Sequence, residues 1–169
     1  FALLEELLLP YTETAEAHIA LAQGAFTKGD KALAIAEANR ALAIKPDSEL
    51  AALTLAQSSE SPAEALQSLE KFIARYPKAR EVRLAHARIL VNQKMYEPAR
   101  KEFEALLELQ PQDTSTLYSL GILSAQANDP KNAERYLTSY LDALEKQQGG
   151  ERDPGQVMLL LAQLADERG

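Results

Sequence analysis

Few side chains in this sequence have the type and spacing that catalysis requires. His18 and His86 are the two histidines, and either could in principle act as a general base or a metal ligand. Neither has a second histidine one helical turn away or a carboxylate at ligand spacing. We therefore expect both histidines to have a structural role. The chain has no cysteine, which removes thiolate nucleophiles, disulfides and cysteine-bound zinc.

The other reactive residue types are equally isolated. No serine lies in the strand–turn–helix setting that exposes a nucleophile. Gly149 and Gly150 are followed by Glu151 and lack the Lys-Ser/Thr pair of a phosphate-binding loop. Adjacent acidic residues such as Glu5 and Glu6 are typical of a solvated helix face. We predict that the protein is not an enzyme, has no catalytic residue and needs no cofactor and no metal.

The composition favours helices. Alanine, leucine and glutamate dominate the 169 residues, whereas only 7 are glycine, and β-branched residues are few. Apolar runs are only a few residues long, too short to cross a bilayer. The net charge of −7 argues against nucleic acid as a partner, although residues 71–101 hold nine Lys/Arg and only two Glu.

The elements that would position any site form a repeat. Pro46, Pro77 and Pro111 follow helix-like runs at separations of 31 and 34 residues, and the segments before them align. A period in this range indicates a stack of similar units, each too small to bury its apolar face alone. Within the aligned units, small residues recur where two helices must approach closely, as at Ala22 and Gly121.

These residues resemble the tetratricopeptide repeat, a helix–turn–helix unit of about 34 residues. In the first unit Leu21, Ala22, Gly29, Ala34 and Pro46 fall on its signature positions, and the later units match at fewer positions. The resemblance implies an all-α fold, a right-handed superhelical solenoid of antiparallel helix pairs with about ten helices.

The predicted organisation is one continuous domain. Its parts are an N-terminal helix and linker (1–14), unit 1 (15–48), a shortened unit 2 (49–77), unit 3 (78–111), unit 4 (112–146), a loop (147–153) and the first helix of a fifth unit (154–169). The cap-then-proline pairs Ser61-Pro62, Asp129-Pro130 and Asp153-Pro154 mark helix starts within this scheme.

The resemblance also implies a binding surface, because the first helix of each tetratricopeptide unit lines a concave groove. Position 5 of the unit is apolar throughout, and position 9 is polar in most units. Such a surface suits an extended or helical peptide, but position 5 could equally well pack between neighbouring first helices. The predicted groove residues are Ile19, Gln23, Phe26, Leu53, Gln57, Leu84, Arg88, Val91, Asn92, Tyr118, Ile122 and Gln126.

We therefore expect an adaptor that binds a protein or peptide segment in this groove, with no nucleic-acid partner and no direct membrane contact from this chain. The alternative is a module for self-assembly, or for packing against other parts of a larger protein, through its terminal helices. Residues 80–137 also look like the repeat region of proteobacterial cell-envelope tetratricopeptide proteins. That resemblance implies bacterial envelope assembly and a place in the periplasm or at the outer membrane. The first residue is Phe1, so we expect the sequence to be a fragment.

Overall fold

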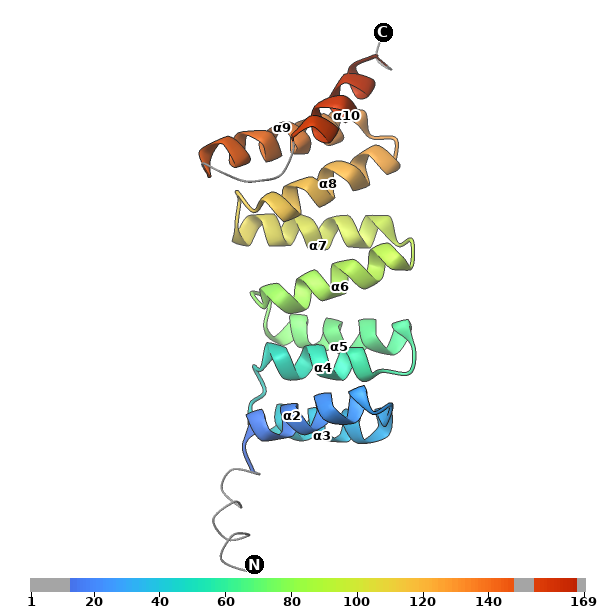
Figure 1. Cartoon of the computed structure of the whole chain (residues 1–169), viewed down its shortest axis with the longest axis vertical. Helices are drawn as coiled ribbons and strands as arrows, with labels where there is room; N and C mark the ends of the chain where they lie inside the picture. The colour runs from blue at the N-terminus through green and yellow to red at the C-terminus, as the bar shows by residue number, and fades with distance from the viewer. Residues whose placement is uncertain (1–12, 148–153, 167–169) are drawn as a thin grey trace, which may run out of the picture. The chain divides into compact units, whose positions relative to one another are not determined.

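The computed structural model of the protein describes residues 13–147 and 154–166, and in these residues it has nine α-helices and no strand (Figure 1). The predicted all-α fold is confirmed. Residues 1–12 of the expected N-terminal helix and linker, and most of the expected loop over 147–153, lie outside the described residues. The chain divides into two compact units, residues 1–89 (the N-terminal unit) and 90–169 (the C-terminal unit), which are described one at a time.

The boundary between these two compact units falls inside helix α6, with residues 80–89 on one side and 90–92 on the other. The helices of the N-terminal unit are α2 (Ala15–Thr27), α3 (Lys31–Ile44), α4 (Glu49–Ser58), α5 (Pro62–Arg75) and the first part of α6 (Arg80–Asn92). Those of the C-terminal unit are the end of α6, then α7 (Tyr96–Leu109), α8 (Thr114–Gln126), α9 (Pro130–Lys146) and α10 (Gly155–Asp166). Even-numbered helices are the first helices of the predicted repeats, and odd-numbered helices the second.

Local capping starts several of these helices. The Ser61 hydroxyl accepts a hydrogen bond from the Glu64 backbone N–H at 3.3 Å, with Pro62 as the first helical residue of α5. Asp129 starts α9 in the same way: its carboxylate accepts from the Asn132 N–H at 3.2 Å. A side-chain oxygen satisfies one of the N–H groups that a helix leaves unpaired at its start. Two of the predicted cap-then-proline starts are therefore present, and the third involves Asp153, which is not described.

The turns inside three repeats use the same backbone conformation at the same repeat position. Gly29, Lys94 and Asn128 have positive φ angles of 82°, 59° and 55°. Glycine adopts this left-handed conformation without steric cost, whereas a residue with a Cβ pays about 1–2 kcal/mol. The shortened repeat that contains α4 and α5 has no residue of this kind between its helices.

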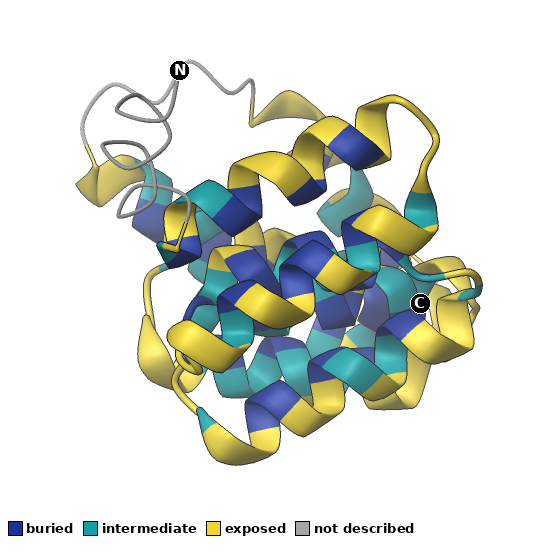
Figure 2. Ribbon diagram, turned by 90° about the horizontal axis from the view of Figure 1, so that it is seen from below, coloured by how far each residue is buried: buried dark blue, intermediate teal, exposed yellow. Residues whose placement is uncertain are grey.

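Alanine-rich packing holds the N-terminal unit together. Ala22 of α2 and Ala34, Ala38 and Ala41 of α3 are completely buried, so these two helices pack through side chains of minimal size. A larger cluster joins α4, α5 and α6, with Leu69 and Val82 completely buried at its centre. Burial of a side chain as large as leucine contributes about 1.5–3 kcal/mol. Buried and exposed residues alternate along the helices, as the colours of Figure 2 show.

The C-terminal unit is built around larger aliphatic residues. Leu106, Leu120 and Leu137 are almost completely buried on α7, α8 and α9. Gly121 lets α8 and α9 approach closely, because a Cβ at this position would lie 2.5 Å from a methyl carbon of Leu137. Ala22 holds the corresponding repeat position in the N-terminal unit.

Candidate functional site

The first helices of the N-terminal unit pack beside one another. Ile19 of α2 is buried in a cluster with Ala51 of α4, and Leu53 of α4 packs against the cluster that contains Val82 of α6. The Glu49 carboxylate at the start of α4 accepts hydrogen bonds from the Glu81 and Val82 backbone N–H groups at 2.9 and 3.3 Å. This carboxylate therefore caps the next first helix, α6, and fixes its position relative to α4.

The predicted groove residues of the N-terminal unit differ in burial according to repeat position. At position 5, Ile19 is buried and Leu53 and Leu84 are half-buried, so these side chains contribute to packing between first helices. At position 9, the side chains are exposed on all three helices: Gln23, Gln57 and Arg88. Phe26, one turn after Gln23 on α2, is 41% exposed. The first helices therefore carry a row of exposed polar side chains, and the aromatic side chain of Phe26 lies near one end of this row.

The predicted groove residues of the C-terminal unit are more open at position 5. Tyr118 of α8 is 37% exposed and its ring lies 5.5 Å from that of Tyr140 on α9, measured between centroids. Leu159, the position-5 residue of α10, is 63% exposed. The remaining predicted residues of this unit are two that are half-buried, Val91 and Ile122, and two that are exposed, Asn92 and Gln126.

The arginines of α6 have different surroundings. The Arg80 guanidinium pairs with the Glu81 carboxylate at 2.7 Å, and Arg83 Nε donates to the Pro77 carbonyl at 2.6 Å. Arg88 is exposed, and no ion pair to it occurs among the described residues. Arg88 is thus the arginine of this helix that is available to an acidic partner on the first-helix side.

Both histidines are buried beside a glutamate from a second helix. His18 Nδ1 lies 2.5 Å from the Glu37 carboxylate, which also accepts a hydrogen bond from Arg40 at 2.5 Å. His86 Nε2 lies 3.5 Å from the Glu70 carboxylate. Glu37 is only 4% exposed, and a buried carboxylate needs such partners because its unpaired charge would cost several kcal/mol. These contacts join helices inside the fold, which is a structural role.

Sequence reasoning overlooked the partner of His18. Glu37 lies 19 positions further along the chain and meets His18 only after the helix pair has closed. A signal was present, because Glu37 is the single acidic residue in the alanine-rich stretch of α3. Within the described ranges, no group of three or more His, Asp or Glu side chains is arranged to hold a metal ion.

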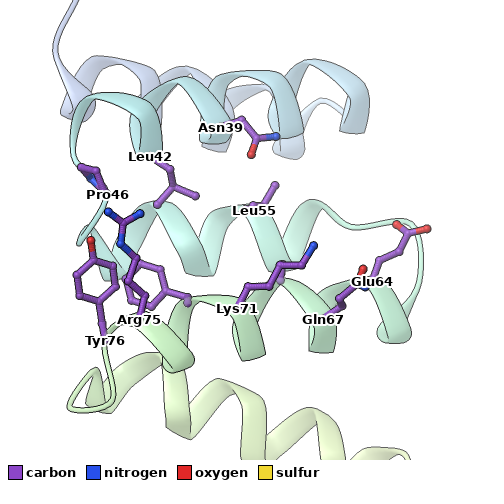
Figure 3. A pocket seen from close by; sticks show the side chains of 11 residues that line it. Asn39, Leu42, Pro46, Leu55, Glu64, Gln67, Lys71, Arg75 and Tyr76 are labelled. Atoms are coloured by element: carbon purple, nitrogen blue, oxygen red, sulfur yellow. The ribbon is translucent and has the colours of Figure 1, made fainter.

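A second kind of concave surface lies between successive second helices. In the N-terminal unit a groove of about 370 Å³ is bounded by α3 and α5, with Leu55 of α4 between them (Figure 3). In the C-terminal unit a groove of about 580 Å³ is bounded by α7 and α9, with Leu117 of α8. We call these the α3/α5 groove and the α7/α9 groove. Neither groove was predicted from the sequence, because the resemblance points to the first helices as the binding surface.

The Glu104 carboxylate of the α7/α9 groove is paired within the protein. The Arg100 guanidinium contacts the Glu97 carboxylate at 2.8 Å and the Glu104 carboxylate at 3.0 Å, and these contacts raise the pKa of Arg100. Burial, together with the negative charge of Glu104, raises the pKa of the Tyr136 phenol, whose hydroxyl donates to Glu104 at 3.3 Å. The Arg135 guanidinium lies over the Tyr136 ring, 4.6 Å from its centroid.

No described helix is both long and apolar enough to cross a lipid bilayer. The fold and the recurrent turn and packing positions define a protein built of repeated helical hairpins. Two family models, each described as a tetratricopeptide repeat, match residues 2–49 and 56–121. The chain is a tetratricopeptide repeat protein. No curated protein matches the sequence significantly.

Solved structures of other repeat proteins agree with this fold. A tetratricopeptide repeat protein from Parabacteroides merdae is 21% identical with a TM-score of 0.71, over 90% of this chain and 60% of that one. MamA is 16% identical with a TM-score of 0.68, over 85% of each chain. PilF of Pseudomonas aeruginosa is 25% identical with a TM-score of 0.65, over 91% of this chain and 68% of that one. This fold is generally a non-catalytic scaffold for protein–protein interactions.

Proposed function

We propose that the chain is an adaptor that holds a segment of a partner protein against the exposed side of its first helices. The observation that supports this proposal most is the row formed by Gln23, Gln57 and Arg88 at the same position of three neighbouring repeats. The side chains that join these helices are buried or half-buried, so the row lies on a supported surface. A ligand bound there would meet a preformed surface and would not have to order it.

The chemistry of this row suits a polypeptide. Glutamine side chains both donate and accept hydrogen bonds, which matches the backbone N–H and C=O groups of an extended segment. Arg88 can pair with a carboxylate, and the exposed part of Phe26 gives an apolar contact near one end. In the C-terminal unit, Tyr118 at position 5 of its repeat is an exposed aromatic residue on a first helix.

Two substitutions at exposed apolar residues test the surface. Phe26→Lys places a charge on the first-helix side of the N-terminal unit, and Leu33→Lys places the same charge on second helix α3, where Leu33 is 46% exposed. Immobilised protein would be used to capture partners from the source cells, with quantification by mass spectrometry. We expect Phe26→Lys to reduce the captured partner at least about tenfold, equivalent to 1.4 kcal/mol. Equal capture by Phe26→Lys and the unsubstituted protein would refute the proposal.

A second candidate function is self-assembly, and the surface of α10 favours it. Met158 and Leu159 are 55% and 63% exposed on this helix, an unusual position for two adjacent large apolar residues. A second copy could cover them. Sedimentation velocity over a hundredfold range of concentration would show a monomer–dimer equilibrium, and Leu159→Lys should abolish it. A monomer at every concentration excludes this function.

We further propose a place in the bacterial envelope, with a part in its assembly. Its support is the likeness of residues 80–137 to the repeat region of proteobacterial cell-envelope proteins. Fractionation of the source cells, with detection of the native protein by antibody, tests it. Recovery in the cytoplasmic fraction alone would remove the envelope role and leave the adaptor function unaffected.

A further inference from the structure

The α3/α5 groove has an apolar floor. Leu42 of α3 and Leu55 of α4 are half-buried, and Phe72 of α5 is buried and also lines the groove. The Phe72 ring packs against the Tyr76 ring with 4.9 Å between centroids, which closes one end of the groove. In Figure 3 the side chains of Leu42 and Leu55 project into this space from α3 and α4, and Phe72 of α5 also lines it. A space of about 370 Å³ accommodates one or two aliphatic side chains of a ligand.

Two cationic side chains lie along one wall of this groove. Lys71 and Arg75 are one turn apart on α5, and both are exposed (Figure 3). Arg75 lies 5.7 Å from the centre of the Tyr76 ring. Among the residues that the structure describes, neither cation forms an ion pair with a carboxylate. Their positive charges are therefore not compensated locally.

The single carboxylate in the lining is already engaged. Glu64 lies at the end of the groove away from Tyr76 (Figure 3), and its carboxylate accepts a hydrogen bond from the Glu60 backbone N–H at 3.2 Å. This contact belongs to the N-terminal cap of α5, where a negative charge is favourable. Glu64 is thus held away from Lys71 and Arg75, and the cationic wall stays open to a ligand.

We propose that the α3/α5 groove binds an acidic, aliphatic segment of a partner protein. An aliphatic side chain of the segment enters between Leu42, Leu55 and Phe72, and a neighbouring carboxylate pairs with Lys71 and Arg75. The apolar floor favours a polypeptide over a nucleic acid, and two cations in a chain of net charge −7 are too few for a phosphate backbone. This surface is separate from the row of Gln23, Gln57 and Arg88 on the first helices. It therefore gives the scaffold a second binding site, whose positive charge is complementary to the negative charge of an acidic ligand.

A synthetic peptide of alternating glutamate and leucine, with blocked ends, is the probe for this site. Titration would be followed by NMR of methyl-labelled leucines in the whole chain. We expect the methyl signals of Leu42 and Leu55 to shift, and the double substitution Lys71→Glu/Arg75→Glu to weaken binding at least about tenfold. Peptides with glutamine for glutamate, or serine for leucine, should bind more weakly than the parent peptide.

Two further variants make the result specific. Lys101→Glu reverses a charge that is also exposed, on α7 of the C-terminal unit, and should leave peptide affinity unchanged. Phe26→Lys should bind this peptide as the unsubstituted protein does, so failure of the first-helix proposal can be told apart from failure of this one. Circular dichroism would establish that the double variant is folded, which we expect because both substituted side chains are exposed.

The proposal is wrong if the peptide fails to bind, or if it binds the double variant with unchanged affinity. Shifts confined to Leu53 and Leu84 would also overturn it, because those residues lie on the first helices. Tighter binding of a single-stranded oligonucleotide than of the peptide, with the same two leucines affected, would replace the proposed ligand by a nucleic acid.

Discussion

The α3/α5 groove and the α7/α9 groove occupy equivalent places in the repeat but differ in their charged groups. In the C-terminal unit, Glu104 of the α7/α9 groove is bound to Arg100 and to Tyr136. In the N-terminal unit, Lys71 and Arg75 have no acidic partner among the described side chains. The Glu104 carboxylate is satisfied by groups of the protein itself, whereas the charges of Lys71 and Arg75 remain for a ligand.

This difference indicates which side chains of a repeat can differ between units without changing how the helices pack. Small residues at the close helix contacts, such as Ala22 and Gly121, determine how near the helices can pack. They therefore determine the arrangement of the helix backbones, which is the framework of the repeat. Charged residues on the outer turns of second helices leave that framework unchanged. Such positions can therefore differ between units, and they decide which groove attracts a ligand.

The largest effect is expected where the two units differ in a packing contact. Gly121→Ala would place a Cβ 2.5 Å from the Leu137 side chain, which is completely buried and has little space to move. Overpacking of this kind costs about 1–3 kcal/mol. Urea unfolding followed by circular dichroism measures the loss. An unchanged free energy of unfolding would mean that α8 and α9 do not depend on a glycine at this contact.

Gly24→Ala is the matched control in the N-terminal unit. Gly24 lies in α2, and no atom of a neighbouring side chain or element is within 4 Å of the place where its Cβ would be. Alanine in a helix interior is about 0.5–1 kcal/mol more favourable than glycine. We therefore expect the same chemical change to stabilise one unit and to destabilise the other.

The second prediction concerns the turn residue that the units share. Lys94 adopts a φ of 59°, where a side chain is strained, whereas Gly29 holds the equivalent position at 82°. Lys94→Gly should raise the free energy of unfolding by about 1 kcal/mol, and Gly29→Ala should lower it by a similar amount. Thermal unfolding of the two variants measures both changes. If both substitutions changed the free energy of unfolding in the same direction, backbone strain would not distinguish these turns.

Much of the fold could be predicted from the sequence because its signals are local. Pro62 and Pro130 each follow a capping residue, and the structure starts α5 and α9 there. Buried small residues such as Ala22 recur at a fixed period, which identifies helix contacts without any knowledge of the partner residue. These signals predict an all-α repeat architecture, and the resemblance of the signature residues to the tetratricopeptide repeat adds the family.

The contacts between distant positions could not be predicted in the same way. Glu49 caps α6 from 32 positions earlier in the chain, and nothing near it in sequence reveals the partner. The α3/α5 groove draws its walls from three helices, so its existence depends on how they pack. At position 5 the sequence left packing and ligand binding open, and burial now differs along the chain from Ile19 (6% exposed) to Leu159 (63%).

The third prediction tests the difference in charge pairing directly. Arg100→Gln removes two ion pairs of the C-terminal unit, and because Arg100 is partly exposed we expect a cost of only about 0.5–1 kcal/mol. Lys71→Gln removes a charge that has no acidic partner among the described side chains, so stability should change by less than about 0.5 kcal/mol. Urea unfolding at low and high salt would measure both. A loss of unfolding free energy for Lys71→Gln as large as that for Arg100→Gln would show that the charge of Lys71 stabilises the fold.

The smallest effect concerns the helix starts of α5 and α9, where Ser61 and Asp129 have the same capping role. Hydrogen bonds from the Asn132 side chain and backbone lower the pKa of the Asp129 carboxyl. A lowered pKa in the folded state means that the stabilisation is present above the unfolded value, about 3.9, and is lost as the pH falls through the folded one. Ser61 does not titrate in this range, so its cap should persist.

Amide hydrogen exchange measured at pH 6 and at a pH below the lowered pKa of Asp129 separates these two starts. Corrected for the intrinsic pH dependence of exchange, protection of the Asn132 N–H should fall on acidification, because the Asp129 oxygen that accepts from it becomes protonated. Protection of the Glu64 N–H, which donates to the Ser61 hydroxyl, should change less. Asp129→Ser should make α9 behave like α5, since it keeps a capping oxygen and removes the titrating group. Acid sensitivity that persists in this variant would place its origin outside the cap, in other carboxylates of the C-terminal unit.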